Sequence, residues 1–251
     1  AGGADRRSRP LRAAVSGVIR TRFVEANGLE FEVAECGGGP RLAICLHGFP
    51  EHAVSWRRQL PMLADLGFRA WAPNQRGYGK SSRPGRVQDY ALGHLVDDVA
   101  ALVDASGARS VVLIAHDWGG VVAWAFAARR VRPLEALIVL NMPHPICFRR
   151  ALGRWRQMAK SWYIAAFQVP WLPDRLLAMG RGRLVEKILR GPRGESARFP
   201  RDVLDVFRDQ AGAPGAATAM LAWYRAAIRG GWKTLLAGLD RAYPFGVRVP
   251  A

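Results

Sequence analysis

The feature that most constrains this chain is an apolar run that ends in a single carboxylate and passes at once into a second apolar segment. The run is Val111-Val-Leu-Ile-Ala-His-Asp-Trp-Gly-Gly-Val121. Its first five residues predict a buried strand, and Val122-Ala-Trp-Ala-Phe-Ala-Ala128 predicts a helix that begins without a linker. A turn this tight needs small neighbours, which Ala115 and the Gly119-Gly120 pair supply. We therefore expect Asp117 at the top of a sheet in a strained backbone conformation.

The pattern is that of a nucleophile elbow with aspartate where serine is usual. A carboxylate with an ordinary pKa of about 3.9 is ionised at neutral pH and needs no base to activate it. It can displace oxygen or halide from a saturated carbon and form an ester that water can then hydrolyse. Epoxide opening and dehalogenation are therefore the candidate reactions. The alternative is that Asp117 only caps the helix, a role that requires no small residues around it.

A second segment is expected to supply hydrogen-bond donors beside this carboxylate. Arg41-Leu-Ala-Ile-Cys-Leu46 predicts a buried strand, and His47-Gly-Phe-Pro-Glu51 follows it directly. The glycine of this segment lets backbone N–H groups face a pocket, and the proline fixes the turn. In a nucleophile-elbow fold one oxyanion-hole N–H comes from this loop and the other from the residue after the nucleophile. These would be the N–H groups of Phe49 and Trp118, although His-Gly-x-Pro alone is also compatible with a simple turn.

Taken together, the motifs resemble the epoxide hydrolase branch of the α/β-hydrolase superfamily. The matching pieces follow the family order from about Val18 onward. They are His47-Gly-Phe-Pro-Glu51, Asn74-Gln-Arg-Gly-Tyr-Gly79, His116-Asp-Trp-Gly-Gly120, Asn141-Met-Pro-His-Pro145, Ser161-Trp-Tyr-Ile-Ala-Ala-Phe-Gln-Val-Pro170 and Ala222-Trp-Tyr-Arg225. The resemblance implies an α/β-hydrolase fold, with a mostly parallel sheet flanked by helices and an inserted helical cap.

The resemblance also implies roles for individual residues. Asp117 would attack an epoxide carbon, while Tyr163 and Tyr224 would bind the epoxide oxygen and protonate it as it becomes an alkoxide, a task that suits phenols with a pKa near 10. The alternative is that both are ordinary tyrosines on cap helices. No cofactor or metal is implied, and the partners would be a small apolar epoxide and water. Further residues expected to line the site are His47, Gly48, Pro50, His116 and Trp223.

Two other reactions stay open within the superfamily. Haloalkane dehalogenases also carry tryptophan after the aspartate, so Trp118 is compatible with them. They usually have asparagine after His-Gly, however, and Phe49 offers no side-chain hydrogen bond. Fluoroacetate dehalogenases would have arginine at the position of Trp118 and rank lower. We therefore favour epoxide opening over halide displacement.

One part of the expected machinery is absent from the sequence. Hydrolysis of the ester requires a histidine base and a carboxylate that orients it, and the resemblance places both after the cap. None of the five histidines (His47, His52, His94, His116 and His144) stands in that place, and Asn141 lies where some dehalogenases keep their acid. We interpret the chain as a fragment that lacks the last core strands. The alternative is a natural truncation, a catalytically silent relative that binds apolar ligands. In either case, the strand before the cap is expected at an open sheet edge.

The net charge of +17 raises a second class of function. Arg149-Arg-Ala-Leu-Gly-Arg-Trp-Arg156 could lie on an anionic membrane as an amphipathic helix. Only four of the basic residues are lysines and no nucleic-acid motif is present, so we exclude nucleic acid as the main partner and rank membrane-surface contact as accessory. No apolar run reaches the ~18 residues of a membrane span. Cys36, Cys45 and Cys147 lack metal spacing and are interpreted as reduced thiols of a cytoplasmic protein.

The expected organisation has four parts. They are a disordered basic arm at residues 1–17, the core at 18–143, the helical cap at 144–238 and a return segment at 239–251. Within the core, strands are expected at 18–34 in a hairpin, 68–72 and 134–140, and helices at 55–66 and 91–105. Residues 192–200 are expected to form a loop inside the cap. The oligomeric state cannot be inferred from the sequence.

Overall fold

The computed structural model describes residues 17–144, 147, 162–190 and 199–230. Their strands form one six-stranded sheet in the order β1-β2-β4-β3-β5-β6. The strands are β1 (Arg20–Ala26), β2 (Leu29–Cys36), β3 (Arg41–Leu46), β4 (Arg69–Pro73), β5 (Ser110–His116) and β6 (Ala136–Leu140). β1 and β2 are antiparallel to each other, and β2 is antiparallel to β4, whereas β4, β3, β5 and β6 run parallel.

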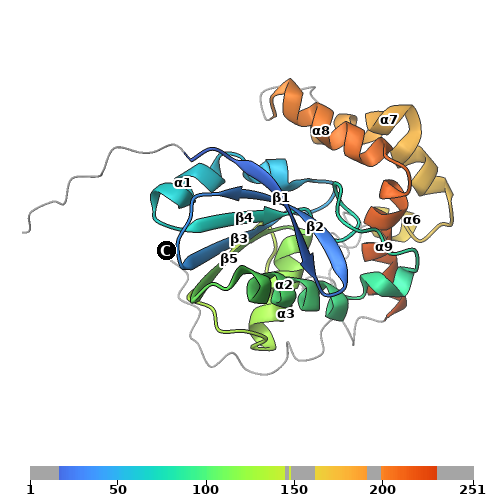
Figure 1. The fold of residues 1–251 in the computed structure, drawn as a ribbon. Coiled ribbons are helices and arrows are strands. Elements are labelled where there is room, and N and C mark those ends of the chain that lie inside the picture. Colours follow the sequence, from blue (N-terminus) through green and yellow to red (C-terminus); the bar gives the residue numbers. More distant parts are fainter. Residues whose placement is uncertain (1–16, 145–146, 148–161, 191–198, 231–251) are drawn as a thin grey trace, which may run out of the picture.

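Helices cover both faces of this sheet. The core helices are η1 (Ala53–Trp56), α1 (Gln59–Asp65), η2 (Val87–Tyr90), α2 (Leu92–Ser106) and α3 (Trp118–Ala128). Because side chains alternate along a strand, Leu42, Ile44 and Leu46 of β3 face the α2 and α3 side, while Ala43 and Cys45 pack against η1 and α1. Figure 1 shows α1 on one side of the sheet and α2 and α3 on the other. Burial on both faces explains why the central parallel strands are continuously apolar.

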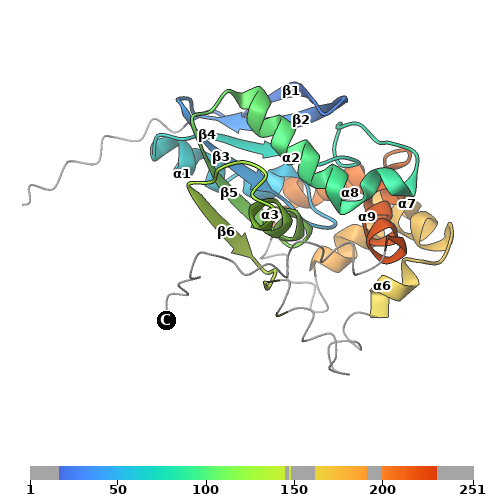
Figure 2. The same cartoon turned by 90° about the horizontal axis from the view of Figure 1, so that it is seen from below.

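A second set of helices gathers at one end of the sheet. These are α6 (Trp162–Ala166), α7 (Leu172–Arg190), α8 (Arg201–Gly212) and α9 (Ala216–Arg229), called here the α6–α9 group. Both views place them together beyond the same end of the strands (Figures 1 and 2). α7 is interrupted at Met179, Gly180, Arg181 and Gly182, whose backbone angles are not helical.

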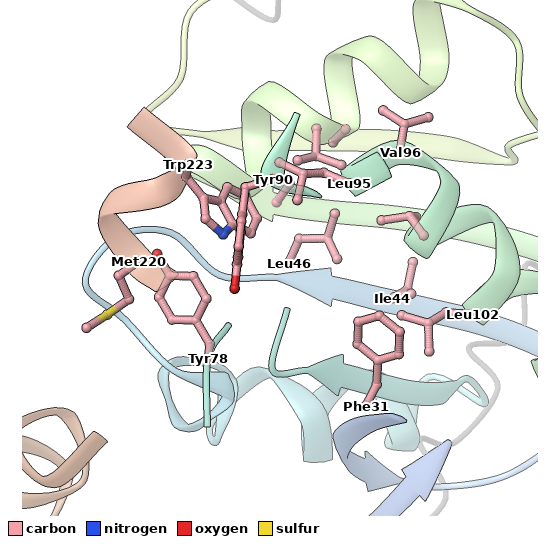
Figure 3. Close-up of a cluster of buried hydrophobic side chains, with 14 of the residues drawn as sticks. Phe31, Ile44, Leu46, Tyr78, Tyr90, Leu95, Val96, Leu102, Met220 and Trp223 are labelled. Atoms are coloured by element: carbon pink, nitrogen blue, oxygen red, sulfur yellow. The ribbon is translucent and has the colours of Figure 1, made fainter. Parts of the chain in front are cut away.

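The α6–α9 group is anchored to the core mainly through α8 and α9. Figure 3 shows Trp223 and Met220 of α9 at one end of the apolar cluster that contains Tyr78 and Leu46. The Trp223 indole N–H donates to the backbone oxygen of Arg76 at 3.2 Å. From α8, the buried side chain of Gln210 donates to the backbone oxygen of Glu51 at 2.7 Å and accepts from the Gly79 N–H at 2.9 Å. These contacts fix the helices over the loops at the carboxyl ends of β3 and β4.

The expected elements of the core are confirmed, with shifts of a few residues at their ends. The hairpin turns at Asn27, and β4 and α2 match the expected strand and helix within two residues. The helix expected at 55–66 is instead divided into η1 and α1. β6 starts two residues later than expected and lies at the sheet edge, with Ile138 and Leu140 47% and 45% exposed. Four predicted segments lie wholly or partly outside the described residues. These are residues 1–16 of the basic arm expected at 1–17, the return segment at 239–251, the Arg149–Arg156 segment, and residues 192–198 of the loop expected at 192–200.

No helix among the described residues combines the length and the apolar character that a bilayer crossing requires.

Candidate active site

Asp117 lies at the junction of β5 and α3 in a strained conformation. Its backbone angles are φ 49° and ψ −119°, which is outside the regions that L-residues favour. The Asp117 N–H continues the β5–β6 ladder by donating to the backbone oxygen of Leu140 at 3.2 Å. The backbone oxygen of Asp117 accepts from the Val121 N–H in the first turn of α3. The strand therefore passes into the helix at a single residue. The Asp117 side chain makes no helix-capping hydrogen bond, so the capping alternative is wrong.

Two glycines allow the chain segments to approach this closely. A Cβ at Gly48 would lie 2.4 Å from the Asp117 Cβ and 2.6 Å from its Oδ1. A Cβ at Gly119 would lie 2.6 Å from the Leu46 oxygen and 2.7 Å from the His47 oxygen. All four distances are far shorter than a van der Waals contact allows. The small residues of the two motifs therefore bring the loop after β3 against the β5–α3 turn.

Backbone N–H groups hold one oxygen of the carboxylate. The Phe49 N–H donates to Asp117 Oδ1 at 2.9 Å. Burial raises the pKa of Asp117 above its ordinary value, and hydrogen bonds from the Phe49 and Trp118 backbone oppose this rise. The two N–H groups expected for an oxyanion hole thus converge on the same side chain. The hydrogen bond from the Phe49 N–H engages Oδ1 of the carboxylate.

Two phenols from the α6–α9 group lie near this carboxylate. Tyr224 of α9 is 6% exposed and Tyr163 of α6 is 37% exposed, with their ring centroids 6.1 Å apart. Burial raises the pKa of Tyr224 well above its ordinary value, and the negative charge of Asp117 adds to this. Burial and the Asp117 charge also raise the pKa of Tyr163, against a hydrogen bond with Tyr224. Both phenols are therefore neutral donors at physiological pH.

Aromatic rings surround the phenols. The Tyr224 ring makes edge contacts with Trp118 at 4.9 Å, Phe167 at 5.0 Å and Phe49 at 5.2 Å between centroids. Phe167 also contacts Tyr163 at 5.6 Å. The Trp118 side chain acts to lower the pKa of the Tyr224 phenol, against the larger effect of burial. A molecule bound beside Asp117 would thus meet aromatic carbon and the phenol hydroxyls.

A second carboxylate, that of Glu51, contacts His116, the residue before Asp117. His116 Nδ1 lies 3.1 Å from Glu51 Oε1, and its Nε2 lies 3.1 Å from the Asn141 amide nitrogen. The Glu51 hydrogen bond raises the pKa of His116. Burial acts to raise the pKa of Glu51, but His116 outweighs it and the net direction is down. Glu51 also accepts from the Gly48 N–H at 3.2 Å, so this pair holds the loop that carries Phe49.

The other histidines of the sequence have different surroundings. His47 is fully buried, contacts the Gly48 oxygen and accepts from the Gln75 N–H, and burial lowers its pKa to about 4. His52 accepts from the Val54 N–H at the start of η1, and burial lowers its pKa to about 3. His94 is exposed on α2, and His144 packs on the Trp124 ring at 4.9 Å.

The structure thus brings Asp117, Phe49, Trp118, Tyr163 and Tyr224 together. Of the other expected site residues, Gly48 lies directly against Asp117, and the His116 ring is held by Glu51 and Asn141. Pro50 is buried in the loop, and the indole N–H of Trp223 is used by the core. Sequence patterns did not predict Glu51 as the partner of His116, Phe167 as part of the aromatic surroundings of the phenols, or the contacts of Arg225 with Asp174. The position of Glu51 four residues after His47 in the same motif is a signal that could have identified it.

Comparison with known proteins agrees with this geometry. The sequence matches the alpha/beta hydrolase fold family over residues 43–223. It is 38% identical over 215 residues to the AB hydrolase superfamily protein YfhM of Bacillus subtilis, covering 84% of this chain and 74% of the relative. It is 37% identical over 211 residues to epoxide hydrolase A of Mycobacterium tuberculosis, covering 79% and 66%. The corresponding values for epoxide hydrolase 3 of Xenopus tropicalis are 34% identity over 205 residues, covering 79% and 56%. The chain therefore spans between about half and three quarters of these relatives.

Solved structures similar to this chain are also epoxide hydrolases. The crystal structure of epoxide hydrolase VrEH1 from Vigna radiata superposes with a TM-score of 0.72 at 32% identity, covering 87% of this chain and 75% of the other. A variant epoxide hydrolase from Bacillus megaterium, complexed with its naphthyloxy-propanediol product, gives a TM-score of 0.76 at 27% identity, covering 85% and 74%.

Proposed function

The chain belongs to the alpha/beta hydrolase fold family, and from the arrangement around Asp117 we propose that it is an epoxide hydrolase-like enzyme acting on small apolar epoxides. The observation that carries the proposal is a carboxylate at a strained elbow, with one oxygen on the Phe49 N–H at 2.9 Å and with two neutral phenols nearby. Relatives named epoxide hydrolase support the same reaction. Residues 18–143 would form the catalytic core and 144–238 the cap.

In the proposed reaction the free oxygen of Asp117 attacks one epoxide carbon. The C–O bond of the ring breaks, its electron pair goes to the epoxide oxygen, and this oxygen takes a proton from Tyr224 or Tyr163. The product of this step is an alkyl ester on Asp117. Its carbonyl oxygen stays beside the Phe49 and Trp118 N–H groups, which are then placed for the tetrahedral intermediate of hydrolysis. The half-exposed Tyr163 can be reprotonated from solvent.

We propose that none of the five histidines of this sequence is the base of the hydrolytic step. His116 has both ring nitrogens engaged, by Glu51 and Asn141, and the pKa values of His47 and His52 are lowered. His94 and His144 are placed on α2 and against Trp124. We therefore propose that these 251 residues carry out alkylation and that the histidine and acid for hydrolysis are not among them.

The reaction is tested by incubating the folded chain with styrene oxide while measuring diol release and intact mass. The expected result is a mass increase of one styrene oxide, mapped to Asp117 by peptide analysis, with no sustained diol release. Asp117→Asn is the matched control because it keeps the shape and removes the charge. Absence of an adduct in the wild type would overturn the proposal, and sustained diol release would show that a base is present.

Halide displacement is the second candidate because a tryptophan follows the nucleophile. Against it, the Trp118 ring packs edge-on against Tyr224, with centroids 4.9 Å apart, and Phe49 has no polar side-chain atom. Incubation with 1-chlorobutane separates the two reactions. Chloride release with an adduct on Asp117, and no reaction with styrene oxide, would favour the dehalogenase.

A further inference from the structure

Arg225 follows Tyr224 on α9 and is 6% exposed. Its Nη1 and Nη2 donate to the two oxygens of Asp174, at the start of α7, over 2.9 and 2.6 Å. Burial acts to raise the pKa of Asp174, but hydrogen bonds from Arg225 and Thr218 outweigh it, and the pKa is lowered. The pair is therefore a buried, bidentate ion pair between α9 and α7.

The same guanidinium also binds the end of the segment that carries the other phenol. Its Nε donates to the Phe167 oxygen at 3.0 Å and its Nη2 to the Val169 oxygen at 3.1 Å. The backbone N–H of Phe167 in turn donates to the backbone oxygen of Tyr163 at 2.9 Å. One side chain on the helix of Tyr224 thus holds the turn of Tyr163.

Arginine is the side chain that this arrangement requires. Four N–H bonds of the planar guanidinium donate at once. Two donate to the backbone carbonyls of Phe167 and Val169 after α6, and two to the Asp174 carboxylate. A lysine ammonium is a point donor and cannot present this fork. The positive charge is also favourable at the carbonyl end of a helix. A general packing role would not require this set of acceptors.

We propose that Arg225, held by Asp174, is a positioning residue that sets the spacing of the Tyr163 and Tyr224 phenols over Asp117. The inference rests on the proposed function, since both phenols must reach one departing oxygen. A misplacement of about 1 Å at a reacting centre lowers a rate by roughly 10²-fold. The contacts of Arg225 therefore control the rate of ring opening more than the binding of an apolar epoxide.

The test compares Arg225→Met and Arg225→Lys with the wild type for alkylation by styrene oxide. The limiting rate at saturating epoxide is expected to fall by roughly 10- to 100-fold in both variants, while the half-saturating concentration changes less than about threefold. Arg132→Met is the matched control, because Arg132 also forms a bidentate pair, with Asp104 at 2.9 and 2.7 Å, on the exposed surface of the core. Rates are normalised to the folded fraction measured by circular dichroism.

Fluorine NMR of 3-fluorotyrosine-labelled protein provides a readout that needs no reaction. The resonances of Tyr163 and Tyr224, assigned with Tyr→Phe variants, should move in both Arg225 variants and stay in place in Arg132→Met. If the wild type forms no adduct, the proposed function fails, while this measurement still decides whether Arg225 sets the spacing. Asp174→Asn supplies the same two readouts should the Arg225 variants not fold. A wild-type limiting rate in Arg225→Lys, or unmoved tyrosine resonances, would overturn the inference.

Discussion

The backbone N–H of Phe49 lies 2.9 Å from Oδ1 of Asp117, although 68 positions separate the two residues in the sequence. This contact joins the loop after β3 to the turn after β5, because β3 and β5 are parallel neighbours whose carboxyl ends meet at the same edge. It holds Oδ1 of the carboxylate, and in the proposed reaction Oδ2 would be the attacking oxygen. The space for this contact comes from Gly48, since a Cβ there would meet Asp117.

Gly48→Ala tests the close approach. The added methyl group would displace the Asp117 side chain or the Phe49 N–H, because only 2.4 Å separates its position from the Asp117 Cβ. Alkylation by styrene oxide, followed by intact mass, should become about 100-fold slower. Gly38→Ala is the control, since nothing lies within 4 Å of a Cβ there. Equal alkylation rates in the two variants would contradict the geometry.

Tyr224→Phe and Tyr163→Phe test the phenols as proton donors. Each substitution keeps the ring and removes one hydroxyl, so the aromatic contacts remain. Loss of a general acid lowers a rate by about 10²- to 10⁴-fold, and Tyr224→Phe should show the larger effect because Tyr224 is buried, whereas solvent can replace a hydroxyl at the half-exposed Tyr163. Tyr90→Phe is the control, since its hydroxyl donates to the Pro84 oxygen. An unchanged alkylation rate in Tyr224→Phe would exclude its assigned role.

The pH dependence of alkylation follows from the directions of the pKa shifts. In the proposed reaction Asp117 attacks when ionised, and its raised pKa moves the acid limb of the rate above the ordinary value of about 3.9. The phenols act when protonated, and their raised pKa values extend the plateau beyond pH ~10. The adduct-formation rate should therefore rise from acid pH to a plateau that stays flat through neutral pH. An acid limb below the ordinary aspartate pKa would disagree with a buried nucleophile.

The turn at Asp117 was predicted because all the residues that produce it lie close together in the sequence. A buried apolar strand, a carboxylate and two glycines lie within eleven residues, and their order leaves one conformation for Asp117. The Phe49 N–H was predicted as an oxyanion-hole donor from the α/β-hydrolase arrangement, in which the loops after two buried strands meet at one edge. Neighbouring residues in the sequence thus predict the turn at Asp117, whereas its contact with Phe49 depends on the parallel pairing of β3 and β5.

Contacts between distant side chains could not be predicted in the same way. His116 and Glu51 are 65 positions apart, and Arg225 and Asp174 are 51 apart. No periodicity relates such residues, because their meeting depends on how loops and helices pack after the sheet has formed. Similarly, helical spacing predicted the α6–α9 group without indicating that α7 is interrupted at residues 179–182.

Arg76→Met tests a buried ion pair that supports the core. Arg76 and Asp98 pair with side chains 5% and 6% exposed, and Asn27 also donates to Asp98 at 2.7 Å. Removing the cation leaves a carboxylate that is buried and without its charge partner, which typically costs about 3–5 kcal/mol. Urea unfolding should show this loss, whereas Arg132→Met should change stability by less than about 1 kcal/mol because its ion pair is exposed. A loss in Arg76→Met no larger than in Arg132→Met would refute the importance of the buried pair.

Asp117→Asn should stabilise the folded chain at neutral pH. Burial raises the pKa of Asp117 in the folded state, so its contribution to stability is fully present below the unfolded pKa of about 3.9 and is lost as the pH rises through the folded pKa. At pH 7 the wild type carries a desolvated carboxylate, which the neutral amide avoids. At pH 7 the melting temperature of the variant should exceed that of the wild type, by roughly 2–4 °C for each kcal/mol gained in the free energy of unfolding. This difference should shrink toward pH 4.

Asp104→Asn provides a control of opposite sign. Hydrogen bonds with Arg132 lower the pKa of Asp104, so its carboxylate stabilises the fold at neutral pH. If Asp117→Asn melts below the wild type at pH 7, the nucleophile is stabilised rather than strained by its surroundings.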